Sequence, residues 1–292
     1  MTVILRASDG ALQVVIEPEQ GGRITSIRGT GREWLAPASP RDPATGFSDA
    51  GSGGWDEVAP TVAACRLPSG RELPDHGDIW RLPWSVLDSG IEHCTMSVAL
   101  TSLPLTLTRT IVVAPDRVRL KYSTESSGAE ASGAESSDSG VPLLWSAHPL
   151  FAAHPGTRIE TDATMITEDF PRAGLSVEWA GALAIDDVSG AQKWFASDAS
   201  VARIRHADGS LLEMTWSSAT LPRLGLFWDT GVFEPHPVVA LEPTTGRRDD
   251  ASAIIDELPR VGPRQALQWW VELRVRRAEQ APPLPPRGDG RG

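Results

Sequence analysis

The sequence lacks the features that mark several large classes of protein. Its 292 residues contain two cysteines, Cys65 and Cys94, which are too few for a disulfide framework and are typical of buried thiols in an intracellular protein. No segment reaches the roughly 18 consecutive apolar residues of a membrane span, and the first residues lack the basic stretch and apolar run of a secretory signal. We therefore expect a soluble, cytoplasmic protein.

Positive charge is also scarce. The chain carries 27 Lys and Arg against 38 Asp and Glu, which gives a formal net charge of -11. Nucleic acids and anionic membranes are bound through basic patches, so neither partner is expected. A neutral or polar small molecule fits better, and the sequence does not indicate an oligomeric state.

Long amphipathic helices are missing, because candidate segments are broken by Pro, Gly or runs of Ser. Short segments in which apolar and polar residues alternate are common instead, and this pattern predicts strands. The clearest are residues 11–16, 23–27, 103–113, 117–122 and 269–276. With 27 Gly and 24 Pro between such segments, the sequence predicts an all-β sandwich or barrel, with residues 103–122 forming a hairpin.

Two segments are too polar to join a core. Residues 124–140 consist mainly of Ser, Gly, Ala and Glu, and we expect them to form a mobile surface loop. Residues 279–292 are rich in Pro, Gly and Arg and are expected to be disordered. Because the strand signals on both sides of the loop are alike and no repeat of fixed period is found, residues 1–278 are predicted to form one domain.

A single carboxylate stands out in the segment Leu241-Glu242-Pro243-Thr244-Thr245-Gly246, which follows an apolar run. A residue before proline is pushed towards extended backbone, so Glu242 is expected at the last step of a strand. On this segment alone, Glu242 is either a solvated acid at a strand end or a group that takes part in chemistry.

Two histidines lie in constrained backbone. His76 lies in Pro74-Asp75-His76-Gly77, a tight turn that lets the backbone approach a ligand, although a surface histidine is the simpler interpretation. His148 lies in Trp145-Ser146-Ala147-His148-Pro149, within an apolar strand. It is either a satisfied core histidine or a general acid whose pKa is tuned by its surroundings.

The aromatic residues are mostly tryptophan, with 11 Trp against 1 Tyr and 6 Phe. The broad face of tryptophan suits both a sandwich core and the C–H face of a sugar. Trp55, Trp80 and Trp228 lie beside acids, glycines or a histidine in loop-like sequence. We take these three as candidate sugar contacts and assign the others to the core.

Taken in order, these segments resemble the aldose 1-epimerase, or galactose mutarotase-like, family. The resemblance rests on residues 21–27 (Gly-Gly-Arg-Ile-Thr-Ser-Ile), 54–61 (Gly-Trp-Asp-Glu-Val-Ala-Pro-Thr), 74–77 (Pro-Asp-His-Gly), 145–151 (Trp-Ser-Ala-His-Pro-Leu-Phe) and 241–246. It covers residues 11–276 and implies a large antiparallel β-sandwich, the galactose mutarotase-like supersandwich. It also implies a sugar-binding cleft and neither a metal nor an organic cofactor.

The resemblance implies an isomerase that interconverts the α and β anomers of an aldose by opening the sugar ring. Opening requires a base that takes the proton of the anomeric hydroxyl and an acid that gives a proton to the ring oxygen. By motif position, Glu242 resembles the family's base, His148 its acid, and His76 the histidine that binds the ring or shares the proton transfer. Positioned acids and bases typically contribute about 10²- to 10⁴-fold each.

Because of two departures from the family pattern, the sequence does not specify which sugar is the substrate. The Asn-Arg pair that precedes the first histidine in galactose mutarotases is missing, and Arg71 or Arg66 stands in that region. The aspartate that holds sugar hydroxyls has Asp229 as its nearest counterpart, and Asp56 completes the substrate-binding candidates. Arg66, Arg71 and Arg81 could meet a phosphate or pair with neighbouring acids, so both free and phosphorylated sugars are retained.

Two other functions are compatible with the same residues. One is a carbohydrate-binding protein without turnover on the same scaffold. The other is a glycoside-processing enzyme, in which Asp56 or Glu57 would form a carboxylate pair with Glu242. The presence of both His148 and Glu242 favours the isomerase, because a binding site needs no matched acid and base.

Overall fold

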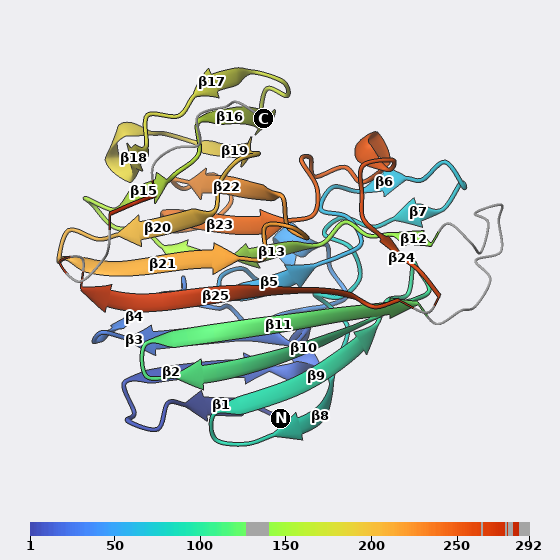
Figure 1. The fold of residues 1–292 in the computed structure, drawn as a ribbon, viewed down its shortest axis with the longest axis horizontal. Helices are drawn as coiled ribbons and strands as arrows, with labels where there is room; N and C mark the ends of the chain where they lie inside the picture. The colour runs from blue at the N-terminus through green and yellow to red at the C-terminus, as the bar shows by residue number, and fades with distance from the viewer. Residues whose placement is uncertain (127–139, 264, 278, 280–282, 286–292) are drawn as a thin grey trace.

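The protein consists almost entirely of antiparallel strands arranged in two facing sheets (Figure 1). The computed structural model describes residues 1–126, 140–263, 265–277, 279 and 283–285. Within these residues the chain contains no α-helix and four short 3-10 helices, and no helix has the length and hydropathy needed to cross a membrane. The prediction of an all-β sandwich is confirmed.

The first sheet has 12 strands. In order across the sheet they are β1 (Val3–Arg6), β2 (Leu12–Glu17), β3 (Arg23–Gly29), β5 (Trp55–Val58), β13 (Ser146–Pro149), β23 (Val238–Thr244), β22 (Arg223–Asp229), β19 (Ala191–Ala196), β16 (Met165–Phe170) and β17 (Ser176–Glu178), with β4 (Arg32–Glu33) beside β3 and β14 (Phe151–Ala152) beside β23.

The second sheet has nine strands. In order they are β18 (Ala182–Ala184), β15 (Arg158–Thr161), β20 (Val201–Arg205), β21 (Ser210–Trp216), β25 (Leu267–Arg277), β11 (Arg117–Ser126), β10 (Leu105–Ala114), β9 (His93–Ala99) and β8 (Ser85–Ser89).

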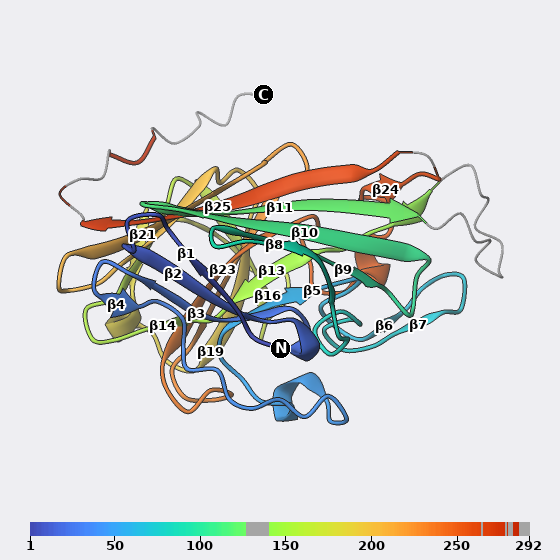
Figure 2. The same cartoon turned by 90° about the horizontal axis from the view of Figure 1, so that it is seen from below.

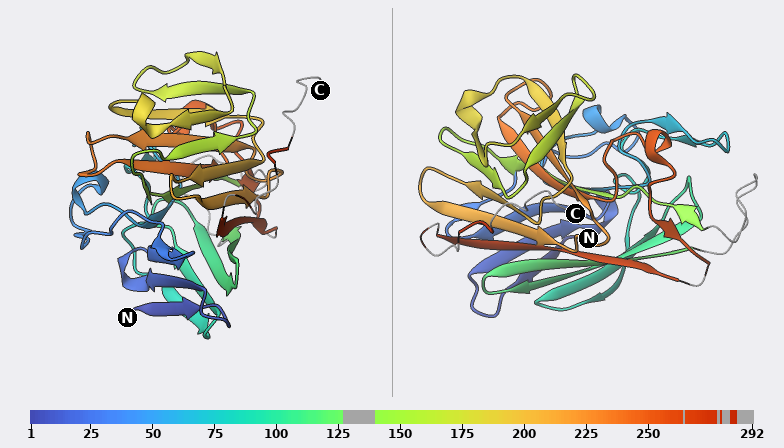
Figure 3. Two further views of the ribbon diagram at one scale, coloured as in Figure 1. Left: turned by 90° about the vertical axis from the view of Figure 1, so that its left-hand side faces the viewer. Right: turned by 45° about the horizontal axis from the view of Figure 1, so that its top comes forward.

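The remaining elements are short. They are the strand pairs β6 (Cys65–Arg66) with β7 (Glu72–Leu73) and β12 (Val141–Pro142) with β24 (Arg260–Val261), and the 3-10 helices η1 (Pro18–Gln20), η2 (Phe47–Asp49), η3 (Ile185–Asp187) and η4 (Ser252–Ile254). Figure 3 shows the N-terminal strands, in blue, at one end of the molecule and the strands β16 and β17, in yellow-green, at the other.

The predicted hairpin is present as β10 and β11, which pair from Ala114 with Arg117 to Leu105 with Ser126. Strand β11 therefore extends into the predicted loop 124–140, and the assignment of residues 124–126 to a loop was wrong. Thr124 is buried and pairs with Leu107 on one side and Leu267 on the other, because the hairpin register carries this polar segment between two strands. Residues 127–139 and most of the predicted tail lie outside the described residues.

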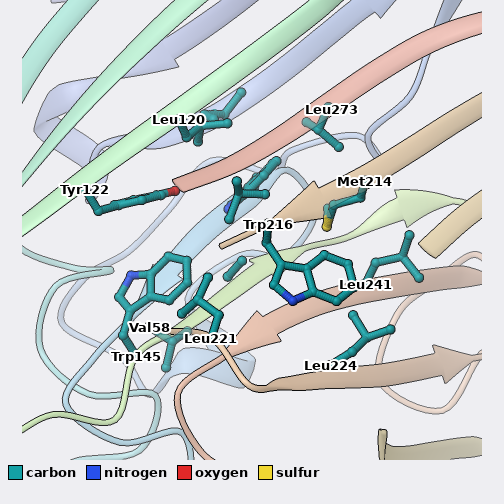
Figure 4. Packing of buried hydrophobic residues seen from close by; sticks show 14 of the residues in the cluster. Val58, Leu120, Tyr122, Trp145, Met214, Trp216, Leu221, Leu224, Leu241 and Leu273 are labelled. Carbon is teal, nitrogen blue, oxygen red and sulfur yellow. The ribbon is translucent and has the colours of Figure 1, made fainter. Parts of the chain in front are cut away.

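The core fills the space between the two sheets, where alternate side chains of each strand point inward. Figure 4 shows Leu120, Met214 and Leu273 of the second sheet facing Leu224 and Leu241 of the first. Fully burying a side chain such as Leu241 stabilises the fold by about 1.5–3 kcal/mol. Since Leu241 points inward, Glu242 must point to the opposite face of the first sheet.

A buried ion pair joins the sheets within this core. Arg109 of β10 donates through Nη1 to Glu57 Oε1 of β5 at 2.8 Å, and Tyr122 Oη donates to the same oxygen at 2.7 Å. Both charged side chains have no exposed surface. Burial raises the pKa of Glu57, against the opposing charge of Arg109. Glu57 is therefore a core residue, which removes it from any catalytic carboxylate pair.

The outer face of the first sheet is covered by a long connection between β4 and β5. Arg23 of β3 donates to the carbonyl oxygens of Ser39 at 2.9 Å and of Gly53 at 3.1 Å, and thereby ties both ends of this connection to the sheet. Figure 2 shows the part that contains η2, in light blue, on the side of the first sheet opposite to β25 and β11. This connection and the sheet beneath it enclose a cavity.

Candidate functional site

A cavity of about 580 Å³ opens on the outer face of the first sheet, a size suited to a small organic ligand. Its floor is formed by side chains of neighbouring strands, namely Asp56 of β5, His148 of β13, Glu242 of β23, Phe227 of β22 and Lys193 of β19. Its rim is formed by loop residues that include Phe47, Asp49, Asp75, His76, Phe233, Glu234 and Asp249.

The strand register explains why these side chains converge. His148 lies opposite Asp56, Glu242 opposite Gly225, and Lys193 opposite Phe227. Paired residues on neighbouring strands point to the same face of a sheet, so the side chains of these pairs lie on the cavity side of the first sheet. Glu242 is followed by two further strand residues, so the prediction that it ends the strand was wrong by this margin.

Glu242 has one engaged and one free carboxylate oxygen. Its Oε2 accepts hydrogen bonds from Lys193 Nζ and, at 3.4 Å, from Ser146 Oγ. Its Oε1 is buried and has no hydrogen-bond partner among the described residues. Leaving such an atom unpaired is costly, so Oε1 is the group of Glu242 that is available to a ligand.

The two predicted histidines meet above the floor. Their ring centroids are 5.4 Å apart at an interplanar angle of 85°, and the ring of Phe47 stacks on His76 at 3.7 Å. Asp75 Oδ2 lies 2.9 Å from His76 Nδ1, and this hydrogen bond lowers the pKa of Asp75. The same hydrogen bond fixes the orientation of the His76 ring at the cavity wall.

The turn that carries His76 is fixed by its backbone. His76 itself has a φ of 54°, and Gly77 a φ of 67°. A Cβ atom on Gly77 would lie 2.0 Å from the carbonyl oxygen of Ala59, so only glycine fits there. The predicted tight turn at residues 74–77 thus brings its histidine to the cavity wall.

His148 is neutral at physiological pH in the sugar-free protein. Burial, together with the positive charges of His76 and Lys193, lowers the pKa of His148 to about 3. Its Nδ1 is buried and has no hydrogen-bond partner among the described residues. The ring can therefore donate or accept a hydrogen bond, but it does not hold a stored proton.

This lowered pKa predicts a contribution to the pH dependence of stability. Below about pH 6.5 the unfolded chain protonates His148 and the native protein does not, so stability is lost as the pH falls from about 6.5 towards 3. His148→Gln should reduce the slope of unfolding free energy against pH by about 1.4 kcal/mol per pH unit between about pH 6 and 4. Urea unfolding at several pH values measures this slope.

The control for this measurement is His236→Gln, because His236 is an exposed histidine outside the cavity wall. It should leave the slope close to that of the wild type. Equal slopes for His148→Gln and the wild type would show that His148 titrates alike in the folded and unfolded chains.

Asp56 is held by an arginine that the sequence did not single out. Arg41 donates to both oxygens of Asp56, at 2.7 and 2.6 Å, and to the carbonyl oxygen of Trp80 at 2.8 Å. This two-point contact fixes the carboxylate and neutralises its charge. Asp56 therefore lines the cavity as a rigid hydrogen-bond acceptor.

The three predicted tryptophans do not line this cavity. Trp55 and Trp80 are buried, and Trp80 supports the site from behind, with its ring 5.1 Å from that of Phe47 in an edge contact. Trp228 lines a separate cavity of about 420 Å³, beside Trp179 and Trp194. The aromatic groups on the cavity wall are phenylalanines, namely Phe47, Phe170, Phe227 and Phe233.

Asp229 and Arg71 also lie away from the cavity wall. Asp229 accepts four backbone hydrogen bonds, of 2.7–3.0 Å, from the N–H groups of residues 231–234. It thereby fixes the backbone of loop residues 231–234, which places Phe233 and Glu234 at the cavity rim. Arg71 donates to the carbonyl oxygen of Ser102 at 2.5 Å, so it supports the fold near the site.

The structure adds site residues that the sequence analysis missed. Lys193 is the most important, because it lies between Glu242 and Asp249, with its Nζ 3.5 Å from Asp249 Oδ1. A signal for Lys193 exists in the sequence, since Lys121 is the only other lysine and Lys193 precedes the apolar residues Trp194, Phe195 and Ala196. The loop residues Phe47, Glu234 and Asp249 carry no such signal. Among the described residues, no group of three or more His, Cys, Asp or Glu could hold a metal ion.

Comparison with solved structures identifies the fold. The Slr1438 protein from Synechocystis sp. PCC 6803 is 19% identical and superimposes with a TM-score of 0.77, covering 94% of this chain and 95% of its own. A putative aldose 1-epimerase from Escherichia coli K12 is 19% identical, with a TM-score of 0.72 and coverage of 95% and 100%. A galactose mutarotase-like protein from Lactobacillus casei ATCC 334 is 14% identical, with a TM-score of 0.72 and coverage of 94% and 100%.

The chain therefore has the galactose mutarotase-like fold, as the sequence motifs predicted. A scan of protein-family models and a search of curated proteins find no match to this chain. At these identities the structural likeness establishes the fold, and the function has to be argued from the cavity itself.

Proposed function

We propose that this protein interconverts the α and β anomers of an unphosphorylated aldose by acid–base opening of the sugar ring. The observation that carries this proposal is the pair of buried, unpartnered polar atoms, Glu242 Oε1 and His148 Nδ1, on neighbouring strands in one cavity. Such atoms need a polar ligand, and a carboxylate facing an imidazole supplies the two partners that ring opening requires.

The proton transfers follow from this arrangement. Glu242 Oε1 takes the proton of the anomeric hydroxyl, the carbonyl forms at C1, and the bond from C1 to the ring oxygen breaks. The ring oxygen takes a proton from the histidine pair. His76, which Asp75 holds through a hydrogen bond of 2.9 Å, gives this proton, and neutral His148 donates a hydrogen bond to the ring oxygen. After the carbonyl carbon rotates, the reverse steps close the other anomer.

The phenylalanines provide the apolar part of the site. Phe227 lies on the floor, while Phe47, Phe170 and Phe233 lie around the rim. Aromatic rings stack well on the C–H faces of sugars, so they can hold the pyranose while Asp56 accepts from its hydroxyl groups.

The charges of the cavity favour a sugar without a phosphate. Six carboxylates line it, on Asp49, Asp56, Asp75, Glu234, Glu242 and Asp249, and Lys193 already lies between two of them. No arginine is part of the described cavity wall. Arg66 pairs with exposed Glu72 at 2.9 Å and Arg71 with a carbonyl oxygen, so neither clamps an anion.

Anomer exchange followed by NMR across a panel of aldoses tests the proposal. Free hexoses and pentoses should exchange faster with the protein than without it, and for at least one sugar the increase should be large. The 6-phosphates of the hexoses should be at least 10-fold poorer substrates, because the cavity repels a dianion. Faster exchange of a sugar phosphate than of its free sugar would contradict the charge argument.

One observation favours a second function, carbohydrate binding without turnover. Glu242 is already paired with Lys193, and His148 lacks a stored proton, so the site can hold a sugar through hydrogen bonds alone. The same experiment separates the two functions. Saturable binding of an aldose without any increase in its anomer exchange would identify a binding protein.

A further inference from the structure

Lys193 is a buried cation that the ring-opening steps do not use. It is 4% exposed, and its ammonium group donates to Glu242 Oε2 and lies 3.5 Å from Asp249 Oδ1. Burial alone would lower the pKa of Lys193, but the charges of Asp249 and Glu242 raise it above its ordinary value. The lysine is therefore charged at physiological pH.

The fold makes room for this contact. Gly225 of β22 lies between Lys193 and Glu242, and a Cβ atom there would lie 3.0 Å from Lys193 Cε and 3.2 Å from Glu242 Cβ. Glycine in the middle of a strand weakens it, and this one allows the lysine side chain to cross β22. The absence of a side chain at Gly225 thus permits the close approach of Lys193 to Glu242.

We propose that Lys193 is a positioning residue for Glu242. It holds Oε2, so that Oε1 points to the ligand, and it places a positive charge against the carboxylate that accepts the proton. The expected effect of Lys193 on the rate rests on the proposed function. Its expected effect on the titration of Glu242 does not, because that effect exists whether or not the protein turns over a sugar.

The other charges around this pair do not replace the lysine. Asp249 and, more distantly, Asp169 face Lys193 and are negative. On the far side of Glu242, His148 is neutral, and Asp56 is compensated by Arg41. Removing Lys193 would leave Glu242 beside Asp249 without a cation, which disfavours ionisation of both carboxylates.

The test compares Lys193→Met with Lys193→Arg and with a matched control, Lys121→Met, which removes the exposed lysine of β11 on the other sheet. Lys193→Met should lower kcat for anomer exchange by about 10- to 100-fold, with KM changed less than threefold. The acid limb of its rate–pH profile should move to higher pH. Lys193→Arg should recover part of the rate, and Lys121→Met should behave as the wild type.

A second readout does not depend on activity. In protein labelled with 13C at the glutamate side-chain carboxyl groups, the signal of Glu242, assigned by its loss in Glu242→Gln, should titrate at higher pH in Lys193→Met than in the wild type. Gly225→Ala, which displaces the lysine stem without removing its charge, should change the titration in the same direction. If Lys193→Met does not fold, Gly225→Ala and Lys193→Gln replace it in the test.

The outcomes separate the two proposals. A moved titration without anomer exchange in the wild-type protein keeps the role of Lys193 and refutes the isomerase. An unchanged Glu242 titration in Lys193→Met, or a wild-type rate and pH profile in that variant, overturns the role of Lys193.

Discussion

Glu242→Gln should abolish most of the anomer exchange while the sugar still binds. Glutamine keeps the shape of the side chain and its hydrogen-bonding capacity but cannot accept a proton, so the rate should fall by about 10²- to 10⁴-fold. The dissociation constant of the sugar should change by less than about tenfold, because binding and proton transfer use the residue differently. Exchange is measured by NMR magnetisation transfer, and binding by calorimetry.

A matched control replaces a glutamate outside the cavity. Glu160 of β15 lies on the second sheet and pairs with Arg205 at 2.7 Å, so Glu160→Gln tests the effect of losing one buried or half-buried carboxylate elsewhere. It should leave exchange unchanged. A wild-type exchange rate in Glu242→Gln would remove Glu242 as the base.

Arg109→Met should destabilise the fold strongly. Arg109 has no exposed surface and is paired with equally buried Glu57, and removing one member of such a pair leaves the other without compensation. The expected loss is about 3–5 kcal/mol in the free energy of unfolding. Urea denaturation monitored by tryptophan fluorescence measures it.

The double variant Arg109→Met/Glu57→Leu tests the cause of that loss. Replacing both members with apolar residues removes the uncompensated charge, so most of the stability should return. Arg66→Met is the matched control, because Arg66 pairs with Glu72 at the protein surface and such exposed pairs contribute about 0–1 kcal/mol. A double variant no more stable than Arg109→Met would mean that packing of the arginine stem, and not its charge, dominates.

Period-two patterns were enough to predict the sheets because a strand with one buried face must alternate. The strands at residues 105–126 and 267–277 illustrate this directly. Residues 124–126 were misassigned because a polar segment can stay in a sheet when both neighbouring strands continue. Local composition does not contain that information.

The site was predictable where backbone constraint and chemistry coincide. Glu242 before a proline, His148 before a proline and His76 in a tight turn all carry local signals, and the structure brings them into one cavity. Asp56 and Glu57 show the limit. They are adjacent in the sequence and chemically alike, yet strand alternation sends Asp56 to the cavity and Glu57 to the core.

Contacts between distant segments could not be read from the sequence. The pairings of Lys193 with Glu242 and of Arg41 with Asp56 depend on strand order and on the path of a long connection. Trp55 and Trp228 were assigned to the site by their loop-like neighbours, but both lie in the core between the sheets. The aromatic side chains of the cavity wall are phenylalanines instead.

The division between floor and rim has an evolutionary consequence. The proposed proton-transfer groups of Glu242 and His148, and Lys193 beside them, lie on strands of one sheet. Hydrogen bonds join these strands to their neighbours, so none of the three residues can move without disturbing the adjacent strands. The rim, in contrast, is supplied by connections such as residues 36–53 and 231–234, which are anchored at a few points by Arg23 and Asp229. Such a scaffold can exchange its connections and thereby acquire new sugar preferences while inheriting the same chemistry.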